Sequence, residues 1–492
     1  MVGRRRHPVG RVSDLTMATG IVAALQERLE PAAVVTEQTD VVPFVMDWWG
    51  RTRGDALCVV LPRSTEDVAT TLALCHENAV PIYPQGGNTS VCLGAIPPER
   101  SGGIVLNLKR MDVVLDVNPS GNVMTVQAGC LLANVQAAAR DADRLFPLSL
   151  GAEGSCQIGG NVATNAGGTG VLRYGNMRDL VLGLEVVLPD GRIWNGLRTL
   201  RKDNTGYDLK NLFIGAEGTL GVITAAVLKL FPRQPNVITA LIALPEIAGA
   251  IAVGAELGAA FPSELTALEL LSSSQLRLVA RHISGVVGPL NLESPWFLLI
   301  EIASVMPCEV LGERLTDHLG TMSGAALVTD AVIATNERQQ TALWHIRHSV
   351  TEANRTEGMG LSHDIAVPVF AVPSFLHAAG DAVGRMFPTA EIVVVGHLGD
   401  GNLHYNVMFS HAAWARVPDQ AMTKREVNRI LYDLAAAHRG TFSAEHGIGA
   451  LHVQEMARYK DSVELDLMRG FKRQLDPRNI MNPHRVLPLS LA

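Results

Sequence analysis

The segment from Gly151 to Gly175, GAEGSCQIGGNVATNAGGTGVLRYG, contains eight glycines and few large side chains. Such a composition disfavours a packed helix or strand, because glycine loses the most backbone freedom in a regular element. Asn161 and Asn165 add small hydrogen-bonding groups, and a flexible linker would lack the interleaved Ile158 and Val162. The segment therefore predicts a backbone cradle for a large cofactor, whose pyrophosphate oxygens accept hydrogen bonds from main-chain N–H groups.

Length and charge limit the classes of protein to consider. A chain of 492 residues with 47% hydrophobic residues predicts two or three folded domains. The net charge of -7 argues against a nucleic-acid partner, which requires a cationic surface. No apolar run of ~18 residues occurs, so no membrane span is expected. The six cysteines form no CxxC pair and are expected to be buried in a reducing compartment.

These features favour a cytoplasmic location, with peripheral membrane association left open and mitochondria as the location in a eukaryote. The first 16 residues are basic and lack an apolar core, so they are not a secretory signal. Two interpretations remain for them: a targeting peptide, or a start assigned too early with Met17 as the true first residue. In either case we expect this tail to be disordered.

The first half of the chain alternates short apolar runs with turn residues. Ser64 precedes acidic residues at the start of an amphipathic run and predicts a capped helix over 64–78. An apolar run at 80–83 leads directly into the glycine-rich PQGGNTS. Further helices are expected at 21–29 and 131–141, and strands at 56–61, 103–108, 113–117, 122–127, 181–188, 192–195 and 222–231.

The pattern changes near Arg233, where we place a domain boundary. Strands are expected at 237–244, 297–303 and 325–329, helices at 247–257 and 307–319, a loop at 442–446 and a closing helix at 462–475. The predicted organisation is an N-terminal tail and first helix (1–40), a cofactor-binding domain (41–233), an α+β substrate domain (234–440) and a C-terminal segment (441–492).

A predicted hairpin brings two histidines together. Ile392 to Val395 is an apolar strand, and Asp400-Gly401 favours a two-residue turn. That register places His397 opposite His404 on one face, with Cβ atoms about 4.5–5.5 Å apart. Asn406 lies two residues further along and points to the same side. A longer loop is the alternative, and it would loosen this pairing.

Glu445 and His446 follow in the sequence SAEHGIG. Neighbours in extended chain point to opposite sides, so we expect these two to do different jobs. Two histidines and one carboxylate form a common set of ligands for a divalent metal ion. Chance clustering is the alternative, since the chain has 15 histidines. His452 and His484 have no partner pattern and are interpreted as structural.

Arg347 and Thr351 lie four residues apart in a helix predicted over 335–355, so they share one face. An arginine in this position can bind a carboxylate through two parallel hydrogen bonds. The alternative is an arginine on a solvated face.

Many of these motifs together resemble a known family, the FAD-linked 2-hydroxy acid dehydrogenases. The enzymes of this family are relatives of D-lactate dehydrogenase, the glycolate oxidase flavoprotein subunit and D-2-hydroxyglutarate dehydrogenase, within the vanillyl-alcohol-oxidase type of flavoproteins. The motifs are PQGGNTS, GSCQIGGNVATNAGG, LRYG, GLEVVLPDG, KDNTGYDLKNLFIGAEGTLGVIT, GHLGDGNLH, AEHGIG and MNP, and they occur in the family's order. The resemblance covers nearly the whole chain after residue 40.

The resemblance implies an α+β fold with a two-subdomain PCMH-type FAD-binding domain, an α+β, ferredoxin-like substrate or cap domain, and a C-terminal helical segment. It implies non-covalent FAD, because the 84–90 loop has no flavin-linking histidine, and no NAD, because the chain has no GxGxxG turn. The implied cofactor-binding residues are Pro84, Gln85, Gly86, Gly87, Asn88, Thr89, Ser90, Gly151, Ala152, Gly154, Ser155, Gly159, Gly160, Asn161, Thr164, Asn165, Ala166, Gly218, Gly221, Ile223 and Asn482.

The resemblance also implies roles in the second half. His397, His404 and Glu445 would bind a divalent metal ion, zinc being the expected one, and His446 would be the catalytic base. Arg347, Thr351 and Asn406 would bind substrate. The relatives carry a lysine for a second substrate carboxylate where this chain has Ser362. This difference puts D-2-hydroxyglutarate in doubt as the substrate and favours a monocarboxylate or a differently substituted acid.

The implied reaction is oxidation of a D-2-hydroxy acid to the 2-oxo acid, with proton transfer to His446 and hydride transfer to flavin N5. An electron-transfer flavoprotein or a quinone is the expected electron acceptor. Three alternatives stay open: an oxygen-using oxidase, a flavoprotein performing non-redox C–O chemistry on a lipid precursor, and a non-catalytic FAD-binding subunit of a larger complex. The sequence leaves open whether the chain forms a homodimer.

Overall fold

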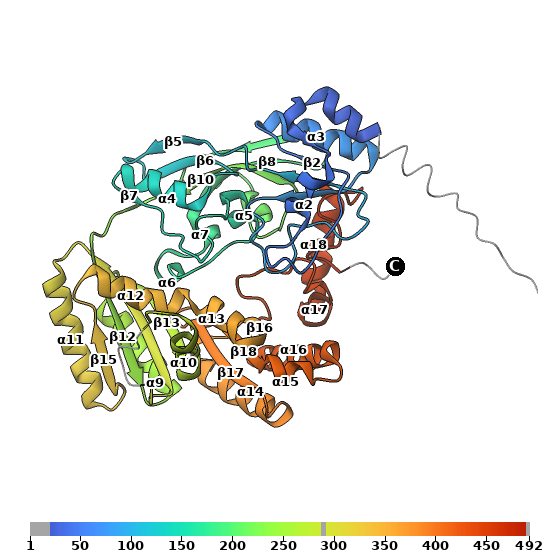
Figure 1. Ribbon diagram of the computed structural model, residues 1–492. Helices are drawn as coiled ribbons and strands as arrows, with labels where there is room; N and C mark the ends of the chain where they lie inside the picture. The colour runs from blue at the N-terminus through green and yellow to red at the C-terminus, as the bar shows by residue number, and fades with distance from the viewer. Residues whose placement is uncertain (1–19, 287–291, 489–492) are drawn as a thin grey trace, which may run out of the picture.

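The computed structural model describes residues 20–286 and 292–488, which form two bodies in contact. The upper body in Figure 1 holds the N-terminal half, and the lower body holds a large sheet with its helices. The predictions for the tail and for Met17 lie outside the described residues. Among the described residues, every helix is too short or too polar to pass through a membrane.

The upper body contains two principal sheets. The four-stranded sheet has the order β1 (Val34–Val35), β2 (Cys58–Val60), β4 (Ile104–Asn107) and β3 (Ile82–Gln85). The five-stranded sheet has the order β5 (Val114–Asn118), β6 (Val123–Gln127), β10 (Val222–Lys229), β8 (Val181–Val187) and β9 (Ile193–Gly196). A small pair joins β7 (Arg144–Leu145) to β11 (Phe231–Pro232).

Helices connect and cover these strands. The predicted cap is confirmed, since Ser64 and Asp67 form a reciprocal capping box at the start of α3 (Thr65–Asn78). A helix also covers residues 20–28. The other helical segments are η1 (Pro31–Ala33), α2 (Gln38–Val45), α4 (Leu132–Asp141), α5 (Ile158–Ala163), α6 (Val171–Tyr174), α7 (Met177–Leu180) and α8 (Lys210–Phe213).

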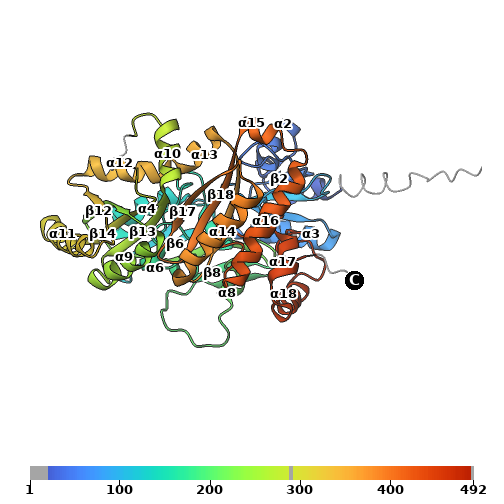
Figure 2. The ribbon, with the colours of Figure 1, turned by 90° about the horizontal axis from the view of Figure 1, so that it is seen from below.

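The lower body is built on a seven-stranded antiparallel sheet. Its order is β15 (Asp330–Ile333), β12 (Asn236–Leu244), β14 (Trp296–Ser304), β13 (Leu265–Ser272), β17 (Glu391–His397), β18 (Asn402–Ser410) and β16 (Gly358–Ala366). One face packs against α9 (Ile247–Ala260), α11 (Cys308–Gly324), α14 (Val372–Met386) and α16 (Gln420–Ala437). In the chain, η2 (Val369–Ala371) directly precedes α14, and α15 (His411–Ala415) directly precedes α16. Figure 2 shows α9, α14 and α16 in front of the sheet.

The opposite face of this sheet packs against α10 (Ser273–His282), α12 (Glu337–His348) and α13 (Val350–Glu357). The remaining helices, α17 (Val453–Tyr459) and α18 (Ser462–Leu475), rise beside the upper body in Figure 1. After α18 the chain pairs with β3: the N–H of Ile82 donates to the carbonyl of Ile480 at 2.7 Å, and the N–H of Asn482 donates to the carbonyl of Ile82 at 2.7 Å.

Four local predictions were wrong. Residues 325–329 form a turn after α11 instead of a strand, and β15 begins only at Asp330. The helix predicted over 335–355 is interrupted at Ser349, which separates α12 from α13. The glycine-rich segment 151–175 is not free of regular structure, since it contains the short helices α5 and α6. Five cysteines are buried as expected, but Cys308 is exposed.

Candidate active site

The candidate site lies across four neighbouring strands of the lower sheet, on the face that carries α10, α12 and α13. Glu269 of β13 is directly opposite His397 of β17. His404 of β18 is directly opposite Asp364 of β16. Since residues alternate between the faces of a strand, all four side chains project from the same face.

The predicted hairpin register was wrong. His397 pairs with Asn402, and His404 pairs with Val395, because the loop is four residues long, from Leu398 to Gly401. The shift relative to the prediction is two residues, which leaves His397 and His404 on the same face. The two imidazole centroids are 5.5 Å apart, so the predicted proximity holds. Asn406 also projects from this face and donates to the carbonyl of His404 at 3.2 Å.

The loop after α16 brings Glu445 and His446 to the histidine pair because a buried carboxylate holds its backbone. Oδ2 of Asp364 accepts the N–H groups of Ala444 at 3.0 Å, Glu445 at 2.8 Å and His446 at 2.8 Å. Its Oδ1 accepts from Nδ2 of Asn402 at 2.8 Å. Asp364 therefore fixes the backbone of a loop that has no regular secondary structure of its own.

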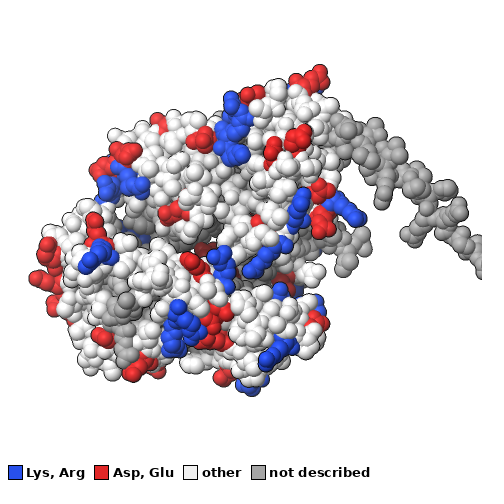
Figure 3. Space-filling view, in the orientation of Figure 1, with Lys and Arg blue, Asp and Glu red and all other residues white. Residues whose placement is uncertain are grey.

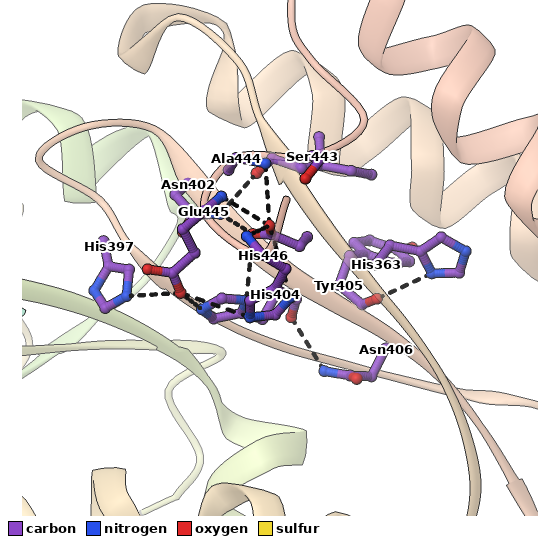
Figure 4. A network of polar contacts seen from close by, with 12 residues as sticks. His363, His397, Asn402, His404, Tyr405, Asn406, Ser443, Ala444, Glu445 and His446 are labelled. Carbon is purple, nitrogen blue, oxygen red and sulfur yellow. Dashed lines mark hydrogen bonds and ion pairs between the residues drawn. The ribbon is translucent and has the colours of Figure 1, made fainter. Parts of the chain in front are cut away.

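Because this loop curls around Asp364, the expectation that Glu445 and His446 point to opposite sides was wrong. Three imidazole nitrogens meet one carboxylate oxygen of Glu445 (Figure 4). Oε1 of Glu445 lies 3.3 Å from Nε2 of His404, 3.8 Å from Nε2 of His397 and 3.8 Å from Nε2 of His446. The rings of His404 and His446 stack with centroids 5.4 Å apart and an angle of 14°.

This arrangement fits a divalent metal ion. Two donors bound to one tetrahedral zinc ion at about 2.0–2.1 Å are about 3.3 Å apart, close to the observed separation between Nε2 of His404 and Oε1 of Glu445. Asp364, His404, Glu445 and His446 offer donor atoms within 4.8 Å of one another. Asp364 is the weakest ligand among them, because its oxygens already accept four hydrogen bonds. It instead faces Nδ1 of His404 at 3.7 Å and Nδ1 of His446 at 3.6 Å.

A second buried carboxylate joins His397 to Arg347. Oε1 of Glu269 lies 2.5 Å from Nδ1 of His397, and Oε2 accepts from Nε of Arg347 at 2.6 Å. The side chain of Glu269 is 1% exposed, so both contacts form in a low-dielectric interior. With its Nδ1 proton directed at Glu269, His397 presents Nε2 to Glu445, which is the orientation that a metal ligand needs.

The charges of this network shift its pKa values. Burial alone would raise the pKa of Glu269, but the positive charges of His397 and Arg347 outweigh it and lower the pKa to about 2. Burial alone would lower the pKa of His397, but Glu269, followed by Glu445, raises it to about 10. Despite burial, the neighbouring imidazoles of His397 and His404 hold the pKa of Glu445 well below its ordinary value.

The residues expected to bind substrate come from different elements of the lower body. Arg347 sits in the last turn of α12, and the part of the chain that the structure describes offers no acceptor to its two Nη groups. Its side chain is only 13% exposed, which excludes the alternative of an arginine on a solvated face. Thr351 is exposed at the start of α13. Ser362 is exposed and pairs with Asn406, two residues from Asp364 on the same face of β16.

The two segments expected to hold the cofactor, 84–90 and 151–166, contact each other in the upper body. A Cβ at Gly87 would lie 2.0 Å from the carbonyl oxygen of Ser155, so only glycine permits this approach. A Cβ at Gly159 would lie 2.7 Å from the Cβ of Ala128. By contrast, Cβ atoms at Gly151, Gly154 and Gly160 would meet open space. The backbone at those positions is free to face a ligand.

Three buried side-chain amide oxygens in or beside these segments accept no hydrogen bond. The side-chain oxygens of Gln157, Asn161 and Asn482 are buried and receive no hydrogen bond. A buried polar atom without a hydrogen-bond partner is energetically costly, so these three oxygens indicate where a bound ligand would supply the partner. Asn482 also contacts the upper body, donating to the carbonyls of Gly94 at 3.0 Å and Glu217 at 2.8 Å. The residues present therefore fit a large polar cofactor such as FAD.

Several residues of the expected cofactor set have structural contacts instead. The side chain of Gln85 donates to the carbonyls of Phe44 and Ala95 and accepts from Asn107. Gly221 packs against β8, and Ile223 is buried in the core. Asn88 donates to the carbonyl of Met46, while Gly218 contacts Pro84. The remaining members lie along the two loops: Gly86, Thr89, Ser90, Ala152, Thr164, Asn165 and Ala166.

The glycine-rich segment and the histidine network meet between the two bodies. A Cβ at Gly167 would lie 3.2 Å from Oε2 of Glu445, and one at Gly399 would lie 2.6 Å from Cδ1 of Leu172. Figure 3 shows a hollow between the upper and lower bodies on the face that it draws. The cofactor cradle and the histidine cluster therefore face a common space.

The sequence reasoning missed Glu269 and Asp364. A carboxylate within the mostly apolar run of β13, LTALELLS, was a usable signal, since a buried charge requires a partner. Asp364 is likewise a buried carboxylate within a strand, β16. Its partners lie about 40 and 80 residues further along the chain, and no local pattern reveals them.

Comparisons with known proteins agree with this geometry. Residues 56–196 match the family model of the FAD binding domain, and residues 233–486 match that of FAD linked oxidases, C-terminal domain. The chain is 39% identical to mitochondrial D-2-hydroxyglutarate dehydrogenase of Bos taurus over 98% of its length and 86% of the relative's. It is 33% identical to a putative mitochondrial D-lactate dehydrogenase of Schizosaccharomyces pombe, covering 92% of this chain and 86% of that one.

The fold resembles the crystal structure of p-cresol methylhydroxylase with a TM-score of 0.75, at 15% identity and 96% coverage of both chains. This likeness confirms the expected mixed α+β fold. The family matches confirm the resemblance found in the motifs. The chain therefore belongs to the FAD-linked oxidase family and is an oxidoreductase similar to D-2-hydroxyglutarate dehydrogenase.

Proposed function

We propose that this protein oxidises a D-2-hydroxy acid to the corresponding 2-oxo acid, using non-covalently bound FAD and a divalent metal ion. The observation that carries the proposal is the meeting of three histidine Nε2 atoms at Glu445, beside the glycine-rich cradle. The matches to D-2-hydroxyglutarate and D-lactate dehydrogenases support the same class of reaction.

Substrate binding is assigned to Arg347. Its Nε is held by Glu269, so the guanidinium plane is fixed while the Nη groups remain available for a carboxylate. A carboxylate held in two places orients the neighbouring C2 atom, and such orientation accounts for a large part of enzymatic rate enhancement. Thr351 and Asn406 complete the proposed substrate-binding group.

Proton transfer is assigned to His446. Its side chain is 39% exposed, more than that of His397 or His404, so it is the imidazole most accessible from solvent. Nδ1 faces Asp364 at 3.6 Å, which leaves Nε2 to accept the hydroxyl proton. The negative charge of Asp364 then stabilises the imidazolium that forms.

Metal binding is assigned to His397, His404 and Glu445. A divalent ion bound there would supply a Lewis acid for the hydroxyl and carboxylate of a 2-hydroxy acid, and bound FAD would supply the two-electron oxidant. Glu269 orients His397, and Asp364 orients His404 through Nδ1. Zinc is the proposed ion, because imidazole and carboxylate ligands suit it.

The side chain of the substrate is assigned from Ser362. This residue lies on the site face of β16, opposite Asn406, and it cannot pair with a second carboxylate as a lysine would. We therefore favour a D-2-hydroxy monocarboxylate. The identity to D-2-hydroxyglutarate dehydrogenase supports the second candidate, D-2-hydroxyglutarate itself.

The proposed electron acceptor is an electron-transfer flavoprotein or a quinone. The direct test is steady-state oxidation of D- and L-2-hydroxy acids, including lactate and 2-hydroxyglutarate, with an artificial acceptor, a quinone or oxygen. The proposal expects a 2-oxo acid from D-enantiomers only, and little peroxide. Peroxide in equal amount to product would identify an oxidase. Absence of product from every substrate would contradict the proposal and favour a non-catalytic subunit.

A further inference from the structure

Glu217, on the turn between α8 and β10 of the upper body, holds the loop that carries Glu445 and His446. Its Oε1 accepts the N–H of Ile448 at 2.7 Å, and its Oε2 accepts the N–H of Gly449 at 2.8 Å. The acceptor and these donors are more than 200 residues apart in the sequence. A carboxylate from the cofactor-binding body is therefore bonded directly to the loop of the candidate active site.

This loop is held from two sides. Asp364 of the lower body accepts three consecutive N–H groups from Ala444 to His446, and Glu217 of the upper body accepts two from Ile448 and Gly449. The two carboxylates bind non-overlapping parts of one short segment. Asp364 sets the loop's position relative to the histidines of the sheet, whereas Glu217 sets its position relative to the cofactor cradle.

The contact with Glu217 requires glycines in the loop. Gly447 has φ +80°, and a Cβ there would lie 2.8 Å from Oε1 of Glu217. Gly449 has φ +51°, and a Cβ there would lie 2.0 Å from the carbonyl oxygen of Cys92. Cys92 also accepts the N–H of Ala450 at 2.9 Å. The loop thus packs against the upper body with no room for side chains at these positions.

Glu217 is also bonded to a residue beside the proposed cofactor site. Its backbone carbonyl accepts from Nδ2 of Asn482 at 2.8 Å, and Oδ1 of Asn482 is one of the buried atoms without a partner. Glu217 has φ 50°, a left-handed conformation that a non-glycine residue keeps only when its surroundings enforce it. One residue thus contacts both the candidate catalytic loop and a candidate cofactor contact.

We propose that Glu217 is a positioning residue that sets the placement of the Glu445–His446 loop relative to the flavin. The inference rests on the proposed function for its kinetic consequence. It predicts that the two carboxylates affect different quantities. Glu217 sets the rate at which substrate reduces the flavin, whereas Asp364 sets the affinity for the metal ion. A residue that only stabilised the fold would lower flavin retention, metal affinity and rate together.

The test compares Glu217→Gln with the parent full-length holoprotein. The amide is nearly the same size, but its NH₂ group would face one of the two backbone N–H donors and lose that bond. Asp67→Asn is the matched control, because Asp67 also accepts two backbone N–H groups of the upper body, at the start of α3. Glu217→Asp, which keeps the charge, serves if Glu217→Gln does not retain FAD.

Four quantities are measured: FAD content, zinc affinity, the rate of flavin reduction at saturating D-2-hydroxy acid, and hydrogen exchange of single backbone amides. In Glu217→Gln we expect FAD content and zinc affinity within about twofold of the parent and flavin reduction at least tenfold slower. We expect exchange at Ile448 and Gly449 at least tenfold faster, with Glu445 and His446 unchanged. Asp67→Asn should reduce its flavin at the parent rate. Glu217→Asp should show a smaller loss of rate than Glu217→Gln.

Unchanged exchange at Ile448 and Gly449, or faster exchange with an unchanged rate of flavin reduction, would overturn the proposal. A parallel loss of FAD, zinc and rate in both Glu217 variants would also overturn it, since that result identifies a structural role. If no 2-hydroxy acid reduces the parent flavin, the proposed function fails instead. The exchange measurement then still decides whether Glu217 holds the loop.

Discussion

Glu269 and Arg347 form a buried ion pair, with Nε of Arg347 2.6 Å from Oε2 of the carboxylate. The other oxygen of Glu269 contacts His397, so one side chain connects the proposed substrate-binding arginine to a proposed metal ligand. The three residues come from β13, α12 and β17, far apart in the sequence. Substrate binding and metal binding are thereby linked through a single carboxylate.

Replacement of Glu269 by glutamine tests this link. The neutral amide cannot accept from both His397 and Arg347, and loss of an outer-shell partner typically weakens metal binding about 10–100-fold. We expect the KM for the 2-hydroxy acid and the Kd for zinc to rise together, each by about tenfold or more.

Glu301→Gln is the control for Glu269→Gln. Glu301 is a half-buried carboxylate of the adjacent β14 that accepts from the hydroxyl of Thr266 and the indole of Trp344. We expect Glu301→Gln to leave the KM for the 2-hydroxy acid and the Kd for zinc within about twofold of the parent values. Equal effects of the two replacements would show that Glu269 acts only through general stability.

Replacement of His446 by glutamine tests the proposed base. We expect FAD to remain bound and flavin reduction to fall by about 10²–10⁴-fold, the usual contribution of a positioned general base. Stopped-flow absorbance of the flavin measures this rate. His411→Gln, on an exposed position of α15, should retain the parent rate. A rate unchanged in His446→Gln would assign proton transfer to another group.

Metal affinity should depend on pH through His397. Glu269 and Glu445 raise its pKa to about 10 against the effect of burial, so in the metal-free protein His397 carries an extra proton across the neutral range. A metal ion must displace that proton from Nε2, so binding is weaker at low pH and strengthens as the pH rises. We expect zinc affinity to increase about tenfold per pH unit from pH 7 to 9, measured by competition with a chelator. An affinity independent of pH would contradict this state of His397.

Replacement of Ser362 by lysine tests the assignment of the substrate's side chain. The new ammonium group would lie on the site face of β16, where it can pair with a second carboxylate. We expect kcat/KM for D-2-hydroxyglutarate relative to D-lactate to rise by about tenfold or more. Ser362→Ala, which adds no charge, should leave this ratio unchanged. A parent protein that already prefers D-2-hydroxyglutarate strongly would show that another residue binds the second carboxylate.

Local patterns predicted the elements of this fold better than they predicted the contacts between them. The cap at Ser64 and the closing helix α18 follow from neighbouring residues, and both were found where expected. The site face of His397 and His404 was also predictable, because a two-residue error in register does not change the face of a strand. The resemblance to the family supplied the roles proposed for Arg347, Glu445 and His446, but it did not point to Glu269 or Asp364.

The contacts that a local pattern could not predict are those made across the chain. Glu445 and His446 converge because Asp364, about 80 residues earlier, accepts the N–H groups of their loop. Without that contact the loop has no periodicity from which to predict a direction. Glu269 and Glu217 are likewise defined by distant partners, although a carboxylate within the apolar strand β13 already indicated a buried pair.

Anaerobic reduction of the bound flavin by a D-2-hydroxy acid, with and without the metal ion, is the most direct test of the central claim. That claim is that the cradle of the upper body and the histidine cluster of the lower body act on one substrate. We predict that the holoprotein loses its flavin absorbance, whereas chelated protein with its full FAD content does so at least a hundredfold more slowly and recovers when zinc is restored. Equally fast reduction in metal-free protein would contradict the account.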